Sequence, residues 1–398
     1  MIYNYVAKLM RMNEIAKFFK NYLNMRRLRN PLVVCLSFVV VGIFALVTLN
    51  LSFLNPIAQV VKDFSMTDIY YQVLRDTGEP RESRAVTIVD MTELYSRSDL
   101  ARVLDNIGEA GAKVIGVDVV FEGLKEDTLG DAMVLDVAKE RKDVVFSYKL
   151  LNYVDDSLQY ADAVHSFFTD SVTVTEGFTN MERNLYGGMK RSLSLGRRCR
   201  GELVSSFILQ VANLYAEREV MPLEDKDLNI NFSPMRFPVV APDSIVGNEG
   251  LVRDRIVLLG AMKDEYDMHY TPLGKMAGVE LLAYSVQTLL QQKEVRKVSG
   301  FWLWVVSFVL VWLTQVMQGR YAAFVSRRRN RFARFYLGTT FVKGIVTFLW
   351  MALLMGVAFV VFAKWDVSFN LGWAFSAIAF LEAARGFYDA CAHSWNKE

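Results

Sequence analysis

Four apolar stretches interrupt an otherwise mixed pattern of polar and apolar residues, one near the start of the chain and three near its end. They cover residues 32–54, 301–318, 340–363 and 367–387. A helix needs about 20 apolar residues to cross the hydrocarbon core of a bilayer, so the pattern predicts four transmembrane helices. The fourth stretch is the weakest, because Asn370 lies inside it and Glu382 and Arg385 lie near its end.

The long segment 55–300 alternates between strand and helix patterns. Leu100, Val103, Leu104 and Ile107 have the spacing of one buried helix face, and Ser96 precedes them as an N-cap. Buried-strand runs are expected at 84–90, 113–121, 143–148 and 255–260, with shorter ones at 171–175 and 228–232, and further helices at 131–139, 202–216 and 278–290. This order predicts an α/β domain with a mostly parallel sheet.

Basic residues are concentrated in two short segments next to the apolar stretches. The basic, amphipathic segment 1–31 includes Arg26, Arg27 and Arg29, and the loop 319–339 includes Arg327, Arg328, Arg329, Arg331 and Arg334. The positive-inside rule assigns both segments, and the tail 388–398, to the cytoplasm. We therefore expect a multi-pass protein of the inner (plasma) membrane, with 55–300 outside and both termini inside.

The same segments permit different interpretations. The first apolar stretch could be a cleaved signal peptide, although no cleavage site follows it. The arginine loop could be a nucleic-acid patch, although its membrane neighbours already account for it. The N-terminal amphipathic segment is compatible with a helix on the inner membrane face or with one docked on a cytoplasmic partner.

The formal net charge of +2 hides a strong segregation of charge. The two cytoplasmic segments are basic, so the excess of acid falls on the external domain and its adjoining span. An acidic exterior disfavours anionic partners, and we expect no nucleic-acid partner. Three cysteines in 398 residues exclude a disulfide scaffold.

Several segments of the external domain form a characteristic ordered set. They are IVDMTELYSR, GAKVIGVDVVF, INFSP, RIVLLGAMKDEYDMHYTPL and AGVELLAYSVQTLL, preceded by DIYYQVLRD. Together they resemble the CHASE type 2 family of extracellular sensory domains. The resemblance covers residues 63–290 and implies a sensory module flanked by membrane helices, upstream of a cytoplasmic kinase or cyclase. We expect the chain to depart from this layout in two ways. No output domain is expected, and the strand ending Asp90-Met91-Thr92-Glu93 lacks one acid of the family's pattern.

Acidic residues follow three of the expected strands, and ligands of parallel sheets bind at the carboxyl ends of strands. We expect a ligand site formed by Asp90, Glu93, Asp118, Gly260, Asp264 and Asp267. Such oxygen ligands would also suit a divalent cation, although the metal, if any, is unknown. The alternative is that Asp90 and Asp118 cap helices or tie loops to backbone amides.

The sequence offers little support for catalysis, and we expect no enzyme and no other cofactor. The three histidines lie in unrelated segments, which disfavours a zinc site. No Gly-x-Ser-x-Gly, Gly-x-Gly-x-x-Gly or P-loop pattern is present, and the turn 186–191 is a weak candidate for binding phosphate.

Two functions therefore compete. The first is a membrane-anchored sensor subunit that binds a ligand outside and signals through its helices to a separate cytoplasmic or membrane protein. The second is an envelope structural or assembly protein whose external domain binds another protein. The bilayer is a partner in both, and a homodimer is compatible with both.

Overall fold

The computed structural model describes residues 29–50, 65–77, 80–94, 96–181, 188–369 and 371–395. The chain divides into two compact units. Residues 67–296 form the sheet unit, and residues 1–66 together with 297–398 form the helical unit. The short strand β16 (Arg296–Lys297) falls at the division between them.

The sheet unit contains a nine-stranded sheet, and six of its strands form a wholly parallel part in the order β12-β2-β13-β3-β4-β6. Its strands are β2 (Val86–Asp90), β3 (Val114–Val117), β4 (Val144–Val154), β6 (Thr175–Phe178), β12 (Val239–Val240) and β13 (Ile256–Gly260). The expected α/β fold with a mostly parallel sheet is confirmed. β13 lies between β2 and β3, because Leu258 is opposite both Ile88 and Gly116.

The sheet continues beyond β4 with three strands that the hydrophobic pattern does not reveal. The outer half of β4 pairs antiparallel with β5 (Gln159–Val164), β5 pairs with β8 (Gly196–Cys199), and β8 pairs with β9 (Glu202–Ser205). The long helix expected at 202–216 is therefore wrong at its start, since β9 precedes α7 (Phe207–Ala216). Residues 171–174 form a turn, and the strand expected there begins only at Thr175.

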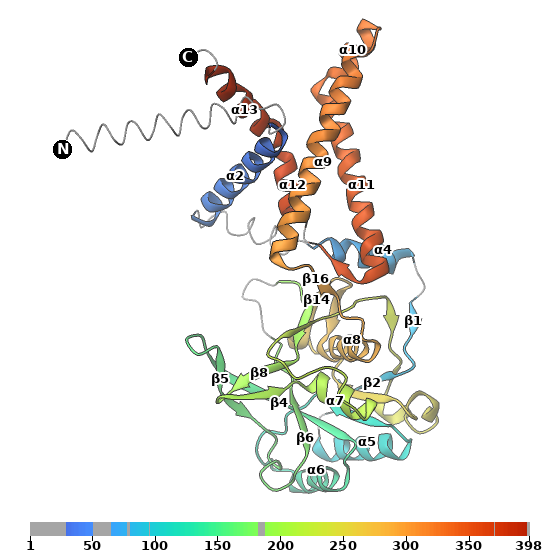
Figure 1. Ribbon diagram of the computed structural model, residues 1–398. Coiled ribbons are helices and arrows are strands. Elements are labelled where there is room, and N and C mark those ends of the chain that lie inside the picture. Colours follow the sequence, from blue (N-terminus) through green and yellow to red (C-terminus); the bar gives the residue numbers. More distant parts are fainter. Residues whose placement is uncertain are drawn as a thin grey trace, which may run out of the picture. The chain divides into compact units, whose positions relative to one another are not determined.

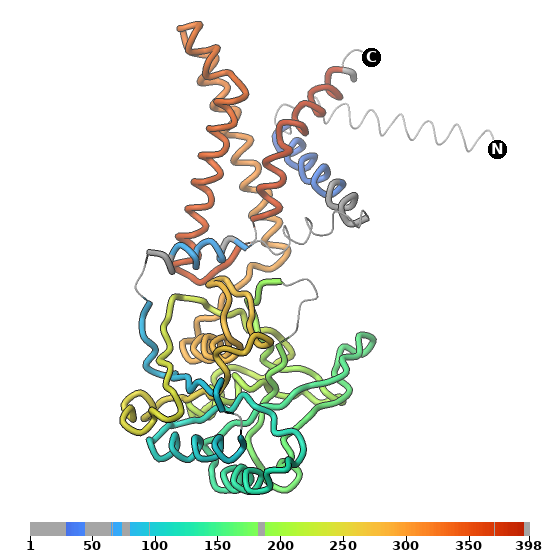
Figure 2. The backbone as a smooth tube through the Cα atoms, turned by 180° about the vertical axis from the view of Figure 1, so that it is seen from behind, coloured from blue at the N-terminus to red at the C-terminus, as the bar shows by residue number. Residues whose placement is uncertain are grey.

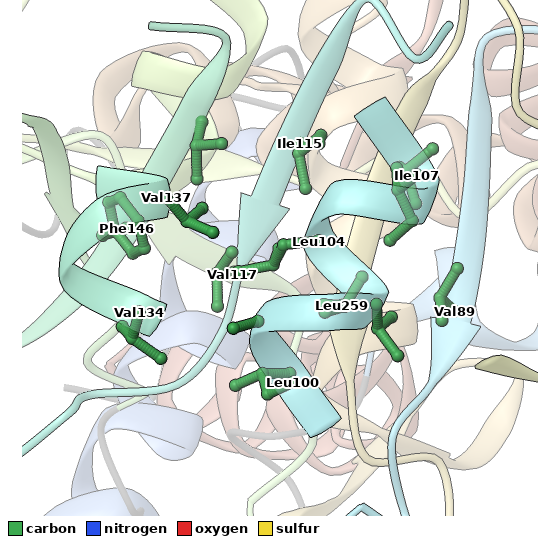
Figure 3. Close-up of a cluster of buried hydrophobic side chains, with 14 of the residues drawn as sticks. Val89, Leu100, Leu104, Ile107, Ile115, Val117, Val134, Val137, Phe146 and Leu259 are labelled. Atoms are coloured by element: carbon green, nitrogen blue, oxygen red, sulfur yellow. The ribbon is translucent and has the colours of Figure 1, made fainter. Parts of the chain in front are cut away.

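Two pairs of helices cover opposite faces of the parallel strands (Figure 1). α5 (Arg97–Glu109) and α6 (Thr128–Glu140) lie side by side on one face, as both views of the backbone show (Figure 2). Their buried side chains meet those of β2, β3, β4 and β13 in one cluster (Figure 3). α7 and α8 (Gly278–Gln291) pack on the other face. Leucine and isoleucine side chains buried in this way each contribute about 1.5–3 kcal/mol.

Ser96 begins α5 as the sequence predicts. Its hydroxyl accepts a hydrogen bond from the backbone N–H of Asp99 (3.0 Å) and donates one to the Asp99 carboxylate (2.6 Å). Leu100, Leu104 and Ile107 are all buried, so the expected helix face is confirmed.

The remaining elements of the sheet unit are short or peripheral. They are α4 (Met66–Thr77), β1 (Arg81–Glu82), β7 (Ser192–Ser194), β10 (Asp227–Asn229), β11 (Met235–Arg236), β14 (Met268–Thr271) and β15 (Gly274–Ala277). β10 pairs antiparallel with β7, so the strand expected at 228–232 lies outside the parallel sheet.

Helices dominate the second unit. They are α2 (Arg29–Asn50), α9 (Gly300–Ser326), α10 (Arg331–Gly338), α11 (Thr340–Trp365), α12 (Gly372–Ala379) and α13 (Leu381–Trp395), with the short strand β17 (Val367–Ser368) before α12. Of the described residues, two helices are long and apolar enough to cross a membrane, α9 and α11. The expected count of four spans is not confirmed.

The first and fourth expected spans differ from single long helices in different ways. α2 counts only as a shorter apolar helix over 29–43, and the side chains of 44–50 lie outside the described residues. The stretch 367–387 begins as β17 and then divides at Phe380 into α12 and α13. α12 has eight residues, or about 12 Å of helix, which is too short to cross a bilayer alone.

The arginine-rich segment 319–339 is largely helical. α9 continues to Ser326, and Asn330 caps α10 by accepting hydrogen bonds from the N–H groups of Phe332 and Ala333. Arg327, Arg328 and Arg329 lie in the short connection between the two helices, and Arg331 and Arg334 lie on α10. Arg26 and Arg27, with the rest of 1–28, lie outside the described residues.

Polar side chains link the helices of this unit. The Arg385 guanidinium donates hydrogen bonds to Gln315 (2.6 Å) and Gln318 (2.7 Å), joining α13 to α9. Gln318 in turn donates to Thr347 of α11 (3.2 Å). Arg29, the first residue of α2, makes a bidentate salt bridge with Asp389 of α13.

Candidate functional site

The connections after three neighbouring strands lead to opposite faces of the sheet. The chain passes from β2 to α5 and from β3 to α6 on one face, whereas the connection after β13, between these strands, leads to α8 on the other. Connections that diverge in this way open a crevice at the carboxyl ends of the strands, where ligands of doubly wound sheets bind.

A cavity of about 390 Å³ lies at this crevice. It is lined by Met91, Asp118, Val119, Val120, Ser147, Lys149, Thr179, Met181, Ala261, Asp264, Tyr266, Asp267 and His269. These residues follow β2, β3, β6 and β13 or lie on β4 and β14. The volume is within the range of sites for small molecules.

Asp118 is the predicted acid that lies deepest in this arrangement. It directly follows β3, and its backbone N–H donates to the Leu259 carbonyl (3.0 Å). Burial raises the pKa of Asp118 to about 6, and the charge of Asp267 adds to this rise. Lys149, the Thr179 hydroxyl and His269 act in the opposite direction. The carboxyl is therefore held beside other charged groups in a poorly solvated place.

A lysine and two hydroxyls complete the β4 and β6 side of the cavity. The Lys149 ammonium donates a hydrogen bond to the carbonyl oxygen of Thr179 (3.3 Å). Ser147 is completely buried, and its Oγ has no hydrogen-bond partner among the described residues. Buried polar groups normally have a partner, so an unpaired hydroxyl at a cavity marks a place where a ligand or a water binds.

Asp267 and His269 form a pair at the opposite wall. The Nε2 atom of His269 lies 3.2 Å from the Asp267 Oδ1 atom. The same carboxylate lies against the first residue of α8, where a Cβ on Gly278 would come within 2.1 Å of the Asp267 Oδ2 atom. Glycine at 278 therefore lets the carboxylate approach the positive end of the helix dipole.

Asp90 serves the loops and does not line the cavity. Its carboxylate accepts hydrogen bonds from the backbone N–H groups of Thr92 and Met262, both at 3.0 Å, and from the Thr92 hydroxyl. Burial alone would raise the pKa of Asp90, but these hydrogen bonds and Lys263 lower it. Asp90 therefore ties loops to backbone amides, as the alternative interpretation suggests. Its carboxylate joins the connection after β2 to the connection after β13.

Of the other predicted residues, one lines the cavity, one packs against α8 and one is exposed outside the cavity. Asp264 lines the cavity and also accepts a hydrogen bond from the Tyr266 N–H (2.9 Å). Gly260 is a packing position, because a Cβ there would lie 2.5 Å from the Val279 side chain. Glu93 is exposed and lies outside the cavity lining. The cavity thus brings together Asp118, Asp264 and Asp267 from the six predicted residues.

Sequence reasoning missed Lys149, Ser147, Thr179 and His269 as lining residues. The sequence did point to Lys149, because this residue directly follows the expected strand 143–148. In the structure it is the first exposed residue of β4. The signal for Thr179 was absent, because the strand before it is short and was expected earlier in the chain. The turn 186–191, suggested for phosphate, lies partly outside the described residues.

The geometry does not assemble a metal site from the described residues, in which no group of three or more His, Cys, Asp or Glu could hold one ion. The reason is that Asp90, Asp264 and Asp267 each bind groups of their own loop or wall. The acids converge on one edge, as the sequence suggests, but not on one point.

A second cavity of about 700 Å³ adjoins the first and shares Met91, Val119 and Val120 with it. Arg97 lines it, but this side chain is occupied with structural contacts. It pairs with Asp131, donates to the carbonyl oxygens of Gly123 (2.9 Å) and Glu122 (3.1 Å), and lies over the rings of Phe121 and Phe167. The guanidinium of Arg97 is therefore occupied by structural contacts, and the other charged residues that line the larger cavity are exposed: Glu122, Lys125, Glu126 and Asp127.

Comparison with known families decides the identity of this arrangement. The family model of the CHASE2 domain matches residues 38–317. The chain belongs to the CHASE2 family. The match contains the whole sheet unit and extends into α2 and α9 of the helical unit. CHASE2 is a family of extracytoplasmic sensory domains, which confirms the resemblance found in the sequence. No curated protein and no solved structure gives a significant match to the chain.

Proposed function

We propose that this CHASE2 protein is a membrane-anchored sensor that binds a small polar ligand in the 390 Å³ cavity at the strand ends. The observation that carries the proposal is that Asp118, Lys149 and the unpartnered hydroxyl of Ser147 all line one cavity. A cavity with a few convergent polar groups and a shifted pKa is typical of a binding site. The sensory character of the family supports a binding role.

The proposed role is binding rather than catalysis. His269 and Asp267 form the acid–base half of a hydrolytic triad, which also requires a nucleophile hydrogen-bonded to the imidazole. Among the described residues no serine, threonine or cysteine hydrogen-bonds His269, so the lining favours recognition. A ligand here would contact the connections after β3 and β13, and the helices would pass the change to a separate cytoplasmic protein.

The binding proposal is tested on the full chain in lipid nanodiscs. A panel of small polar metabolites is screened by the shift of the thermal midpoint, with Asp118→Asn and Lys149→Gln as variants and Asp105→Asn, an exposed position on α5, as the control. A ligand at about 100 times its Kd stabilises the folded state by about 2.7 kcal/mol. A midpoint shift that both cavity variants reduce supports the proposal. A shift that both variants leave intact places the ligand elsewhere and overturns it.

The proposed orientation has the sheet unit outside and both termini in the cytoplasm, on the basis of the arginines before α2 and between α9 and α11. An alkaline phosphatase fusion at about residue 200 tests it. We expect an active fusion, because this enzyme requires an extracytoplasmic location to form its disulfides. An inactive fusion at normal expression reverses the orientation.

A further inference from the structure

The ligand class can be narrowed from the charges that face the cavity, on the basis of the function proposed above. Asp118 and Lys149 both line it, and they influence one another electrostatically. Neither forms a salt bridge with any side chain that the structure describes. Two opposite charges thus face one space without neutralising one another by contact.

The groups around Asp118 and Lys149 do not neutralise these two charges. Lys149 donates its hydrogen bond to a backbone carbonyl, that of Thr179, and an ammonium has three donors. Two other acids line the cavity. Asp267 contacts His269 and lies against the start of α8, and Asp264 accepts a hydrogen bond from the Tyr266 N–H. Asp118 and Lys149 are therefore the acid and the base that a ligand can address.

We propose that the cavity binds a small zwitterion, a compound with an ammonium and a carboxylate such as a free amino acid. The ligand ammonium would pair with Asp118, the ligand carboxylate would pair with Lys149, and the buried Ser147 hydroxyl supplies a further polar contact. A ligand with both charges satisfies both groups at once. A simple anion leaves the carboxylate of Asp118 unpaired in a poorly solvated place, which is costly. A simple cation pairs with Asp118 but makes no use of the exposed ammonium of Lys149.

The size and walls of the cavity agree with this class. A volume of about 390 Å³ admits a compound of amino-acid size together with ordered water. Met91, Met181 and Ala261 provide apolar surface for a side chain. Divalent cations are disfavoured, because the described residues contain no cluster with three metal-ligating side chains.

The test uses the full chain in nanodiscs and three matched sets of probes, with binding measured by calorimetry. The first set is the twenty common amino acids, tested one by one. The second set lacks the carboxylate and contains ethanolamine, putrescine and cadaverine. The third set lacks the amine and contains lactate, succinate and malate, and glucose serves as an uncharged probe.

We expect at least one amino acid to bind with a stoichiometry near one, and its amine and acid counterparts to bind at least about tenfold more weakly, the value of a charged hydrogen bond. Asp118→Asn and Lys149→Gln should each weaken the amino acid about tenfold or more, while Asp105→Asn leaves it unchanged. A single cooperative thermal transition without ligand, at a midpoint no lower than that of the wild type, shows that the variants are folded.

Three results overturn the inference. If an amine binds as tightly as any amino acid, the site prefers simple cations to zwitterions. If lactate, succinate, malate or glucose binds best, the ligand is not a zwitterion. In both cases binding that Asp118→Asn abolishes still supports the proposed sensor. If none of the probes binds at millimolar concentration, the zwitterion is excluded, and the wider metabolite screen decides separately whether the cavity binds anything.

Discussion

In the sheet unit, Asp118 and Lys149 face a cavity without a salt-bridge partner among the described residues, whereas in the helical unit Arg385 donates hydrogen bonds to both Gln315 and Gln318. The two regions therefore use charged side chains differently. In the helical unit polar groups link the apolar helices, where few other directional contacts exist. In the sheet unit the buried core already fixes the strands, so some polar groups at the strand ends remain free to bind.

The comparison also applies within the sheet unit. Arg97 of α5 and Asp131 of α6 form an ion pair, with only 11% and 7% of their side chains exposed. Arg97 lines the larger cavity, which shares Met91, Val119 and Val120 with the cavity that Asp118 lines. One cavity wall is thus stabilised by a committed ion pair, and the neighbouring wall keeps a charge that reduces stability, as functional sites do.

The largest effect is expected at the committed pair. Asp131→Asn keeps the size of the side chain but leaves the buried Arg97 guanidinium without its counter-charge, which costs about 3 kcal/mol. For a domain of this size that lowers the thermal midpoint by roughly 6–12 °C, measured by calorimetry in nanodiscs. The control is Asp136→Asn on the same helix, whose exposed pair with Lys139 should contribute less than about 1 kcal/mol. Equal effects of the two variants would contradict the contrast.

Substitution of Asp118 should raise the stability of the protein, whereas substitution of Asp131 should lower it. The folded-state pKa of Asp118 is raised from 3.8 to about 6 by burial and by Asp267, against Lys149, Thr179 and His269. Between about pH 4 and pH 6 the folded state binds more protons at this carboxyl than the unfolded state, so its contribution to stability falls as pH rises. Asp118→Asn removes that loss, and should stabilise the protein at pH 7.5 by on the order of 2 kcal/mol.

The check is the thermal midpoint of both proteins across this pH range. The advantage of Asp118→Asn over the wild type should shrink as the pH falls and disappear below about pH 3, where the wild-type carboxyl is protonated in both states. Asp105→Asn, which changes an exposed carboxyl on α5, should show no such trend. A variant less stable than the wild type at pH 7.5 would make Asp118 a structural residue.

Much of the sheet unit could be predicted from the sequence, because its parallel strands are short apolar runs and its helices have one buried face. β2, α5, β3, α6, β13 and α8 follow this pattern. β5, β8 and β9 do not, because they lie in the antiparallel extension and alternate only weakly between buried and exposed positions. Val144–Val154 is one strand although only its first half is buried throughout.

The site was predictable as an edge of the sheet but not as a set of contacts. Residues after β2, β3 and β13 were expected to meet, and Asp118, Asp264 and Asp267 do line one cavity. Nothing in the spacing reveals that β13 lies between β2 and β3, or that Asp90 turns toward Thr92 and Met262. Those facts depend on long-range pairing, which local periodicity does not encode.

A smaller effect is expected from the polar links of the helical unit. Arg385→Leu removes the hydrogen bonds to Gln315 and Gln318, and interhelical hydrogen bonds in membrane proteins contribute about 0.6 kcal/mol each on average. We expect a loss of about 1 kcal/mol in reversible unfolding of the helices in mixed micelles. Phe387→Leu, at an exposed position of the same helix, is the control and should change little. A loss of stability as large as that of Asp131→Asn would contradict the expectation that these interhelical hydrogen bonds contribute less than the buried ion pair.

The smallest effect is expected at the salt bridge between Arg29 and Asp389. Its geometry is bidentate, with the Arg29 Nη2 atom 2.7 Å from the Asp389 Oδ2 atom, but 42% and 49% of the two side chains are exposed. Exposed pairs contribute about 0–1 kcal/mol and weaken with salt. A double-mutant cycle with Arg29→Gln and Asp389→Asn should therefore give a coupling below about 1 kcal/mol in low salt, which disappears near 1 M salt. A coupling that persists in high salt would mean that α2 and α13 shield this pair from solvent, and the helical unit would then contain a committed ion pair like that of Arg97 and Asp131.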